Sequence, residues 1–363
     1  MAERFWPEDA RKFCKGLGIT HPIIQAPMAG GLVPPELVAA VSNAGGLGSY
    51  PGGYVTPDAL DSGIKKIKEL AERPFSVNLF IPEESPPAAA PSPRVAKKLS
   101  EMAAEVGAPG PGSSAKDSYT FEDQLAVVVD NDVPVFSFTF GMPDASQIKM
   151  LRSRGVAVIG TATSVAEARR LEEAGCSAVV AQGIEAGGHR GTFPDTPHLP
   201  MTGTMALVPQ IADAVNIPVV ASGGIMDGRG IVAALALGAS AVQMGTAFLG
   251  AAEASVPEAW LRAIDESDDT STVLTRVYTG KYARGIRNRF FEDMASLEAE
   301  VPHFSVYQSL TVPIRAAAKA KGDARFMSLW AGQAAPMSRR LTAAELVEVL
   351  AQESRGVLEG MGR

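Results

Sequence analysis

The chain has 363 residues, 46% hydrophobic and 20% charged, which allows one large domain with an appendage or two ordinary domains. Its net charge of −7 argues against the nonspecific attraction to phosphate on which nucleic-acid binding depends. Two cysteines and four histidines, none at metal-ligand spacing, exclude a disulfide framework and the common zinc motifs.

Eight short apolar runs alternate with amphipathic stretches between residues 22 and 246. The runs begin at residues 22, 46, 75, 134, 156, 178, 218 and 241, and stretches typical of helices lie between them, including 35–44, 57–72 and 165–174. Eight such βα units over about 225 residues predict a (β/α)₈ TIM barrel. An open doubly wound sheet is the alternative, but the first run ends without the glycine spacing of a dinucleotide fingerprint.

Two of the intervals between strands are longer than the rest. The first contains a proline-rich insertion at about 81–117 with a predicted helix at 95–106, which we interpret as a surface excursion rather than an active-site lid. The second contains the loop 185–204, which lies on the side of the barrel where enzymes of this fold place their sites. We therefore expect function in the second loop.

The regular alternation stops after residue 251. We expect residues 1–251 to form the barrel, and residues 252–363 to form a mainly helical C-terminal subdomain packed on it, with an extended segment at 273–285 and a final helix near 343–350. No stretch approaches 18 uncharged apolar residues and no cleavage pattern is present, so we expect a cytoplasmic protein without a membrane partner.

The ends of the strands limit the chemistry, because in a barrel they face a common cavity. Their clearly titratable side chains are Glu185, His189 and Arg190, with neither a lysine for a Schiff base nor a ring of carboxylates for a divalent metal. Such a cavity indicates an organic cofactor. His189, preceded by two glycines, is the candidate acid or base, and we expect Glu185 and Arg190 to form an ion pair that holds the loop.

Small residues at the last two strand ends indicate where an anionic part of the cofactor binds. Residues 221–225 and 243–246 each precede a helix, so they can present backbone N–H groups to a phosphate. The loops after strands seven and eight are the usual phosphate site of a barrel. Tight turns alone would explain either glycine cluster, but less well both of them.

Taken together, seven segments resemble the nitronate monooxygenases, formerly called 2-nitropropane dioxygenases. These segments are 22–28, 77–80, 179–191, 221–225, 243–248, 284–288 and 330–336. The resemblance implies an FMN-binding (β/α)₈ barrel with a helical C-terminal part, and it matches His189 to the catalytic histidine of the family. The FMN contacts that it implies come from Met28, Asn78, Gln182, Gly187, Gly223, Gly224, Gln243, Met244, Gly245 and Thr246, with Gln333 closing the site.

The implied reaction is the oxidation of an alkyl nitronate, of the propionate 3-nitronate type, by dioxygen to a carbonyl product with nitrite and nitrate. It passes through a flavin semiquinone and needs no reduced nicotinamide. His189 would stabilise negative charge through its protonated form or a hydrogen bond, or act as the base when a neutral nitroalkane is the substrate. The expected partners are this small molecule and dioxygen, and a homodimer is left open.

Two alternatives share parts of this pattern. The first is an NAD(P)H-dependent FMN reductase of the enoyl-acyl-carrier-protein or quinone type, which has the same barrel and nearly the same histidine loop. The second is a barrel without redox activity that binds a phosphorylated ligand. The segments 284–288 and 330–336 favour the nitronate monooxygenases over the reductases.

Overall fold

Eight parallel strands form a barrel in the computed structural model, which describes residues 5–83, 90–110 and 119–361. The strands lie in the order β1-β9-β8-β6-β5-β4-β3-β2, and hydrogen bonds from Gln25 N to Leu47 O (3.0 Å) and from Leu47 N to Ile23 O (2.9 Å) join the two ends. Their bounds are β1 (Ile23–Gln25), β2 (Ser49–Pro51), β3 (Ser76–Phe80), β4 (Val135–Thr139), β5 (Ala157–Ala162), β6 (Ala178–Gln182), β8 (Val219–Ser222) and β9 (Ala241–Met244). The predicted TIM barrel is confirmed.

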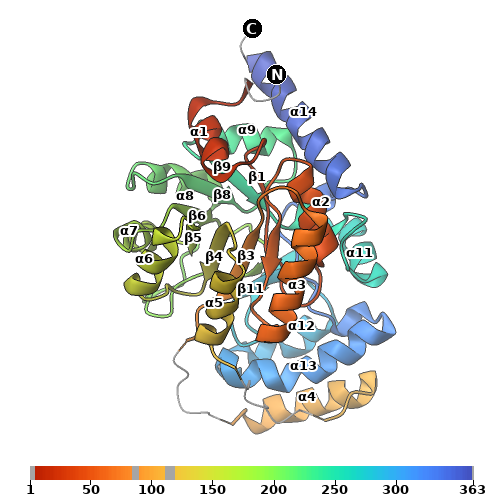
Figure 1. Ribbon diagram of the computed structural model, residues 1–363. Coiled ribbons are helices and arrows are strands. Elements are labelled where there is room, and N and C mark those ends of the chain that lie inside the picture. The colour runs from red at the N-terminus through yellow and green to blue at the C-terminus, as the bar shows by residue number, and fades with distance from the viewer. Residues whose placement is uncertain (1–4, 84–89, 111–118, 362–363) are drawn as a thin grey trace.

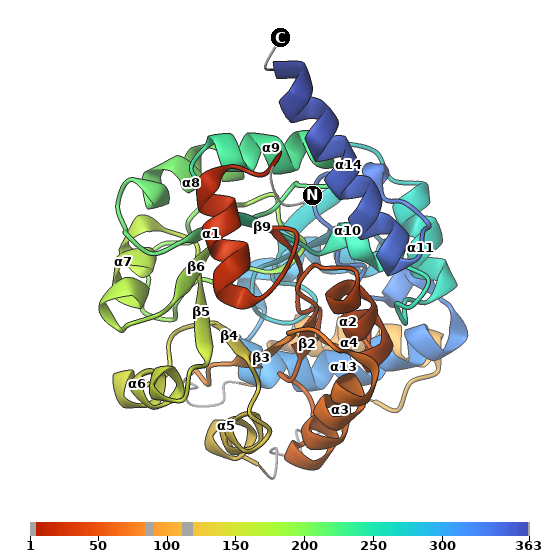
Figure 2. The same cartoon turned by 45° about the horizontal axis from the view of Figure 1, so that its top comes forward.

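Helices surround the strands as an outer ring (Figure 2). The helices of the barrel part of the chain, including α1 outside the ring, are α1 (Glu8–Leu17), α2 (Pro35–Asn43), α3 (Pro57–Leu70), α5 (Phe121–Asp130), α6 (Ala145–Ser153), α7 (Val165–Glu173), α8 (Thr204–Ala212), α9 (Gly228–Ala236) and the short α10 (Thr246–Leu249). Local signals start several of them: Thr120 and Asp123 form a capping box at α5, and the Ser164 side chain caps α7. The three helices predicted between strands are confirmed to within two residues at each end.

The interior of the barrel is apolar towards the N-terminal ends of the strands. Inward-facing residues such as Val135, Ile159 and Val220 form a buried cluster there. Helix α1 adds Phe13 and Cys14 to this cluster and so covers the N-terminal end of the barrel. A large site inside the barrel is therefore restricted to the C-terminal ends of the strands.

A second apolar cluster lies beside the barrel and is built mostly from the C-terminal part of the chain. Helix α4 (Pro93–Val106), which follows the proline-rich stretch, packs in this cluster beside α13 (Figure 1). The predicted helix at 95–106 is thus present. The other helices of this part are α11 (Glu258–Asp265), α12 (Arg289–Met294), α13 (Phe304–Lys321) and three short 3₁₀ helices, Ala295–Glu300, Ala324–Phe326 and Ala335–Met337. The last helix, α14 (Ala343–Met361), instead packs on α2 and α9 of the barrel.

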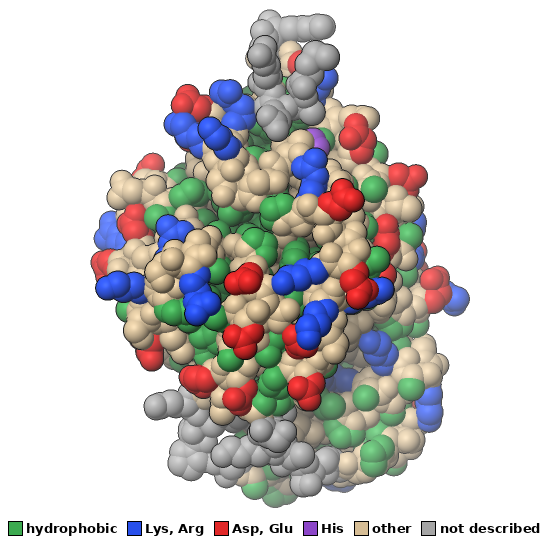
Figure 3. Space-filling model, in the orientation of Figure 1, with side chains coloured by type: hydrophobic (Ala, Val, Ile, Leu, Met, Phe, Trp, Pro, Cys, Tyr) green, Lys and Arg blue, Asp and Glu red, His purple; other side chains and the backbone are tan. Residues whose placement is uncertain are grey.

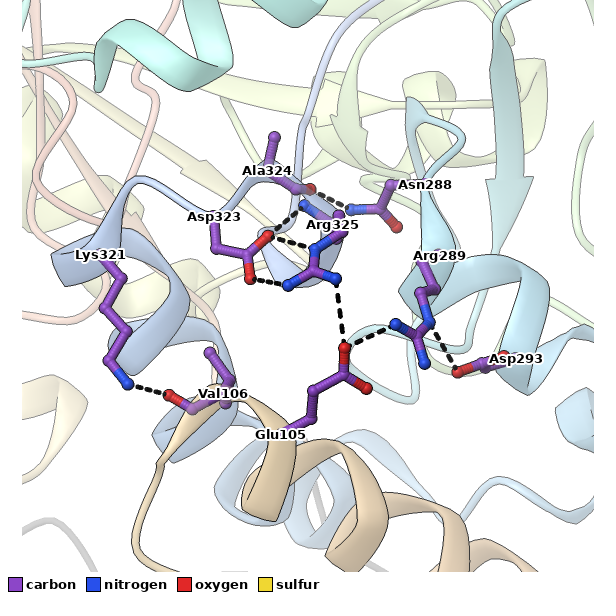
Figure 4. A network of polar contacts seen from close by, with 9 residues as sticks. All are labelled: Glu105, Val106, Asn288, Arg289, Asp293, Lys321, Asp323, Ala324 and Arg325. Atoms are coloured by element: carbon purple, nitrogen blue, oxygen red, sulfur yellow. Dashed lines mark hydrogen bonds and ion pairs between the residues drawn. The ribbon is translucent and has the colours of Figure 1, made fainter.

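Polar contacts reinforce the attachment of α4 to the C-terminal part (Figure 4). Glu105 pairs with Arg289 at 2.5 Å and with Arg325 at 3.2 Å. Lys321 at the end of α13 donates to the carbonyl oxygen of Val106 at 2.6 Å. These contacts join a segment inserted in the third βα unit to helices about 200 residues later in the chain.

The expected extended segment at 273–285 is two strands rather than one. Strands β10 (Thr272–Thr275) and β11 (Ala283–Ile286) pair antiparallel, and Gly280 in the turn between them has a φ of +86°. A third strand, β7 (Gly188–His189), adds to β11 from the sixth loop of the barrel. The C-terminal part therefore supplies the backbone partner of the candidate histidine.

No helix in the described ranges is long and apolar enough to cross a membrane.

Candidate active site

A cavity of about 1030 Å³ lies at the C-terminal ends of the barrel strands. The loops after the strands form one part of its wall, and α13 with the segment around Trp330 forms another. A smaller cavity of about 560 Å³ lies near α1 at the opposite end, where no predicted site residue is found. The larger cavity has the size of a cofactor site and the position usual for active sites in this fold.

The alternation of side chains along the strands places polar residues inside the barrel, towards the C-terminal ends of the strands. In β6, Val179 and Ala181 pack outward against the helices, so Val180 and Gln182 face the interior. Inward-facing uncharged polar residues at the ends of the other strands line the same cavity: Asn78, Ser137, Thr161, Ser222 and Gln243. This layer offers hydrogen-bond donors and acceptors without charge, which suits the edge of a polar heterocyclic ring.

Glycines open the cavity wall at the ends of β8 and β9. Gly223 and Gly224 have φ values of +120° and +72°, which side-chain-bearing residues rarely adopt. Gly245 also lines the cavity, and a Cβ there would lie 3.6 Å from Ala26 and Met28, which is an ordinary contact distance. The short helix α10 begins at Thr246, as in the barrel phosphate sites that use an extra helix after the last strand.

The start of α9 differs from what the sequence suggests. The side chain of Asp227 accepts hydrogen bonds from the backbone N–H groups of Arg229 (3.0 Å) and Gly230 (3.2 Å). These two donors of the helix N-terminus are therefore occupied within the protein. An anion in this part of the cavity would contact the Gly223–Gly224 turn and the Gly245–Thr246 backbone instead.

His189 is held by segments distant in sequence. Its backbone pairs with Ala283 of β11, and its imidazole Nε2 lies 2.9 Å from the hydroxyl oxygen of Thr279. The side-chain amide of Gln182 donates to the carbonyl oxygen of His189 at 3.1 Å and accepts from Gly191 N at 2.8 Å. Both the ring and the backbone of His189 are therefore positioned before any ligand binds.

Aromatic rings surround the imidazole of His189. The ring centroids of Phe140, Phe304 and Trp330 lie 5.9, 5.8 and 5.3 Å from it. Burial, and after it the positive charges of Lys281 and Arg315, lower the pKa of His189 to about 3. The imidazole is neutral at neutral pH, so it can act as a base or through a hydrogen bond. The expected stabilisation of an anion by protonated His189 does not fit this environment.

Glu185 and Arg190 hold the histidine loop, but they do not form the expected ion pair. Arg190 is 1% exposed and donates to the carbonyl oxygens of Gln182 (3.0 Å), Gly183 (2.6 Å) and Pro200 (3.2 Å). Glu185 accepts from the backbone and hydroxyl groups of Thr204 at the start of α8, at 2.9 and 2.8 Å. Backbone carbonyl oxygens at both ends of this loop therefore satisfy the buried guanidinium in place of a hydrogen-bonded carboxylate.

The cavity brings together the predicted site residues, with one exception. Its lining includes Met28, Asn78, Gln182, Gly187, His189, Gly223, Gly224, Gln243, Met244, Gly245 and Thr246. The side chain of Gln333 is exposed and outside the lining, whereas its backbone N–H donates to the Glu185 carbonyl oxygen at 3.0 Å. Its neighbours Gly332 and Ala334 line the cavity in its place.

Gly187 has a packing reason as well as a place in the cavity. A Cβ at this position would lie 2.6 Å from backbone atoms of Ala331 and Gly332. Only glycine allows the histidine loop to approach the 330–336 segment so closely. This contact places the segments 179–191 and 330–336, both singled out in the sequence, side by side at the cavity.

Other residues of the site carry no local signal in the sequence. Tyr54 follows β2, Arg315 belongs to α13, and both line the cavity. Thr279 lies in the turn between β10 and β11, where its hydroxyl meets His189. Strand ends alone do not reveal Arg315 or Thr279, because α13 and this turn follow the barrel in the chain.

Comparisons with known proteins agree with this geometry. A family model described as nitronate monooxygenase matches residues 11–353. The probable nitronate monooxygenase of Staphylococcus saprophyticus is 43% identical over 344 residues, covering 94% of this chain and 97% of that protein. Among solved structures, nitroalkane oxidase from Streptomyces ansochromogenes is 42% identical with a TM-score of 0.87, covering 95% of this chain and 98% of that one. FabK from Thermotoga maritima is 31% identical with a TM-score of 0.77, covering 97% and 98%. The chain belongs to the nitronate monooxygenase family of oxidoreductases.

Proposed function

We propose that this protein is an FMN-dependent nitronate monooxygenase that oxidises alkyl nitronates with dioxygen to a carbonyl product, nitrite and nitrate. The observation that carries the proposal is the neutral imidazole of His189 in its cavity. Uncharged polar side chains at the strand ends and the backbone of Gly223, Gly224 and Gly245 line this cavity. Family membership supports a flavin. The preferred substrate class is an alkyl nitronate of the propionate 3-nitronate type.

The residues of the cavity fit FMN. The Gly223–Gly224 turn and the Gly245–Thr246 backbone would hold the phosphate, because these residues line the cavity and the three glycines leave their backbone N–H groups uncovered by side chains. Asn78 and Gln243, with the sulfur-containing Met28 beside Gly245, would meet the ring. Once bound, the flavin supplies the one-electron redox chemistry of the reaction.

His189 handles the proton. The hydroxyl of Thr279 has a single hydrogen and lies 3.2 Å from the carbonyl oxygen of Lys281, to which it can donate. It then accepts from Nε2–H of His189, which leaves the lone pair on Nδ1. With a neutral nitroalkane, this nitrogen takes the α-proton and gives the nitronate beside an imidazolium. With a nitronate as substrate, no proton has to leave carbon.

The aromatic rings around His189 keep water away from the reacting atoms. Phe140, Phe304 and Trp330 contact the imidazole, and all three line the cavity. A dry environment keeps the imidazole neutral and strengthens its hydrogen bonds. It also limits hydrolysis and proton exchange at the substrate carbon.

Oxygen uptake by the FMN-loaded enzyme with a panel of nitronates, with and without NAD(P)H, tests the proposal. We expect uptake and nitrite formation without NAD(P)H. Rapid bleaching of the flavin by NADH or NADPH, with no uptake on nitronates alone, would identify a reductase instead. A colourless protein that takes up no FMN would contradict both.

His189→Asn separates the role of the histidine from that of the fold. We expect this variant to retain FMN and to lose most of its turnover with neutral nitroalkanes, since an amide cannot take the α-proton. Turnover with preformed nitronates should fall much less. Unchanged turnover with nitroalkanes would give His189 a structural role.

A further inference from the structure

A carboxylate from the proline-rich insertion reaches the surroundings of His189. Glu83 follows β3, and its two carboxylate oxygens lie 3.0 Å from Nζ of Lys281 and 3.3 Å from Nε2 of His303. Lys281 comes 198 residues later in the chain, in the turn between β10 and β11, and His303 directly precedes α13. Burial raises the pKa of Glu83, but hydrogen bonds and charges from these two partners lower it by more, so the carboxylate is ionised at neutral pH.

The pair of Glu83 with Lys281 is largely buried. On the face shown in Figure 3 acidic and basic side chains lie interspersed over the surface, and exposed pairs of this kind contribute little to stability. The side chains of Glu83 and Lys281 are instead 22% and 16% exposed. The ammonium of Lys281 also lies 4.6 Å from the ring centroid of Phe140 and 6.0 Å from that of Phe304. A cation buried in this way depends on its carboxylate, because an unpaired buried charge is strongly destabilising.

Lys281 shares its turn with the hydroxyl group that meets His189. The hydroxyl of Thr279 lies 3.2 Å from the carbonyl oxygen of Lys281, and the backbone N–H of Lys281 donates to the same hydroxyl at 3.4 Å. Nε2 of His189 lies 2.9 Å from that hydroxyl. A continuous series of contacts thus leads from Glu83 through Lys281 and Thr279 to the imidazole. A shift of the Lys281 backbone would move the Thr279 hydroxyl directly.

The same carboxylate holds the start of α13 beside this turn. His303 precedes Phe304, whose ring lies 5.8 Å from the imidazole of His189 and lines the cavity. Gly280 of the turn packs closely here, because a Cβ added to it would lie 2.9 Å from the backbone nitrogen of Phe304. The turn and the start of α13 are therefore in direct contact, and Glu83 pairs with a side chain from each.

We propose that Glu83 is a positioning residue of the active site, which acts through Lys281 and His303 to fix the two segments that hold the ring of His189. This inference rests on the proposed function and adds to it a residue outside the lining of the cavity. It also gives the proline-rich insertion a role, because the geometry of the proposed base depends on a residue at the start of that insertion.

Glu83→Gln removes the charge and keeps the size of the side chain. In oxygen uptake by the FMN-loaded variant, we expect kcat with neutral 1-nitropropane to fall about 10-fold and KM to change less than about twofold, because the ring that takes the α-proton loses its alignment. With preformed 1-propylnitronate, kcat should change less than about twofold, since no proton has to leave carbon. Lys281→Met should show the same loss, and the double variant should lose no more than either single variant.

Glu300→Gln is the matched control. Glu300 also fastens the insertion to the C-terminal part, through Arg94 at 2.5 Å and the hydroxyl of Ser92 at 2.6 Å, and its side chain is 30% exposed. Neither of these partners lines the cavity. We expect Glu300→Gln to keep kcat with both substrates within about twofold of the original enzyme.

Proton NMR of the FMN-free protein gives a measurement that does not depend on turnover. The downfield Nε2–H signal of His189 is identified by its absence from His189→Asn. We expect this proton to exchange with solvent about 10-fold faster in Glu83→Gln than in the original protein or in Glu300→Gln, because its hydroxyl acceptor is displaced. Lys281→Met leaves no buried ammonium unpaired, so it covers the case in which Glu83→Gln fails to fold, and it should show the same faster exchange.

Several results would overturn the inference. They are an unchanged kcat with 1-nitropropane in Glu83→Gln or Lys281→Met, an equal loss with the nitronate, an equal loss in Glu300→Gln, and an unchanged exchange rate of the imidazole proton. If the original enzyme oxidises neither substrate, the proposed function fails. The exchange comparison then still decides whether Glu83 positions the imidazole.

Discussion

The buried imidazole of His189 predicts a specific dependence of stability on pH. In the unfolded chain a histidine titrates near pH 6.5, whereas in the fold the pKa of His189 is lowered to about 3. Between these values the unfolded chain binds a proton that the folded chain does not. The free energy of unfolding therefore falls as the pH drops below about 6.5, and this loss ends near pH 3.

The size of the effect follows from the two pKa values. From pH 7 to pH 5, protonation of the unfolded chain at this one site lowers the free energy of unfolding by about 2 kcal/mol. Any folded-state pKa below about 4 gives nearly the same figure, because His189 is then neutral in the fold at pH 5. His189→Asn removes this site, so the variant should lose about 2 kcal/mol less than the original protein over the same range.

Urea unfolding of the FMN-free protein and of His189→Asn at pH 7 and pH 5 measures this difference. A proton NMR titration of the imidazole signals provides an independent check, which is practical because the chain has four histidines and the variant identifies the signal of His189. An imidazole signal absent from the variant and titrating between pH 6 and 7 would refute the reasoning. An identical pH dependence of unfolding in the two proteins would refute it too.

Three further substitutions test the site and its support. Gly245→Ala should fold with unchanged stability, because the added Cβ makes only ordinary contacts. It should bind FMN at least 10-fold more weakly in a fluorescence titration, and equal affinity would show that the phosphate binds elsewhere. Asn288→Ala removes the acceptor of the Tyr278 hydroxyl (2.7 Å), the hydrogen bonds donated to the Ala324 and Met327 carbonyl oxygens, and the cap of α12. The free energy of unfolding measured in urea should fall by about 3 kcal/mol, and a fall under 1 kcal/mol would contradict this. Thr279→Val should keep FMN, because His189 loses only the partner that orients its ring. Its kcat with neutral nitroalkanes should fall about 10-fold, and the pH profile of kcat should change. Thr279→Ser should restore both kcat and the pH profile. Failure of the serine variant to restore them would count against this role.

The sequence predicts the barrel well because each strand carries its own signal. Buried parallel strands are continuous apolar runs, and the observed strands begin within three residues of the predicted starts. Helix starts were also visible, since side chains such as Ser164 cap them locally. These features depend on residues close together in the chain.

The site could be predicted only where it is made of strand ends. His189 and the glycines around Gly223 and Gly245 were found because the fold brings all strand ends together. Thr279 and Arg315 were missed because their positions depend on how the C-terminal part packs, and no local pattern reports that packing. The ion pair of Glu185 with Arg190 was wrongly expected because neighbouring opposite charges suggest pairing, whereas the loop offers Arg190 carbonyl oxygens at shorter range.

The pairing of β7 with β11 has a consequence for how the protein is made. Translation completes the last barrel strand at Met244, before the residues of β11 exist. A nascent barrel at that stage has no strand beside His189 and no hydroxyl from Thr279, which comes 90 residues after the histidine. The proposed base therefore gains its position late in biosynthesis, and a nascent chain that ends at the barrel would hold the histidine loop without its partner strand.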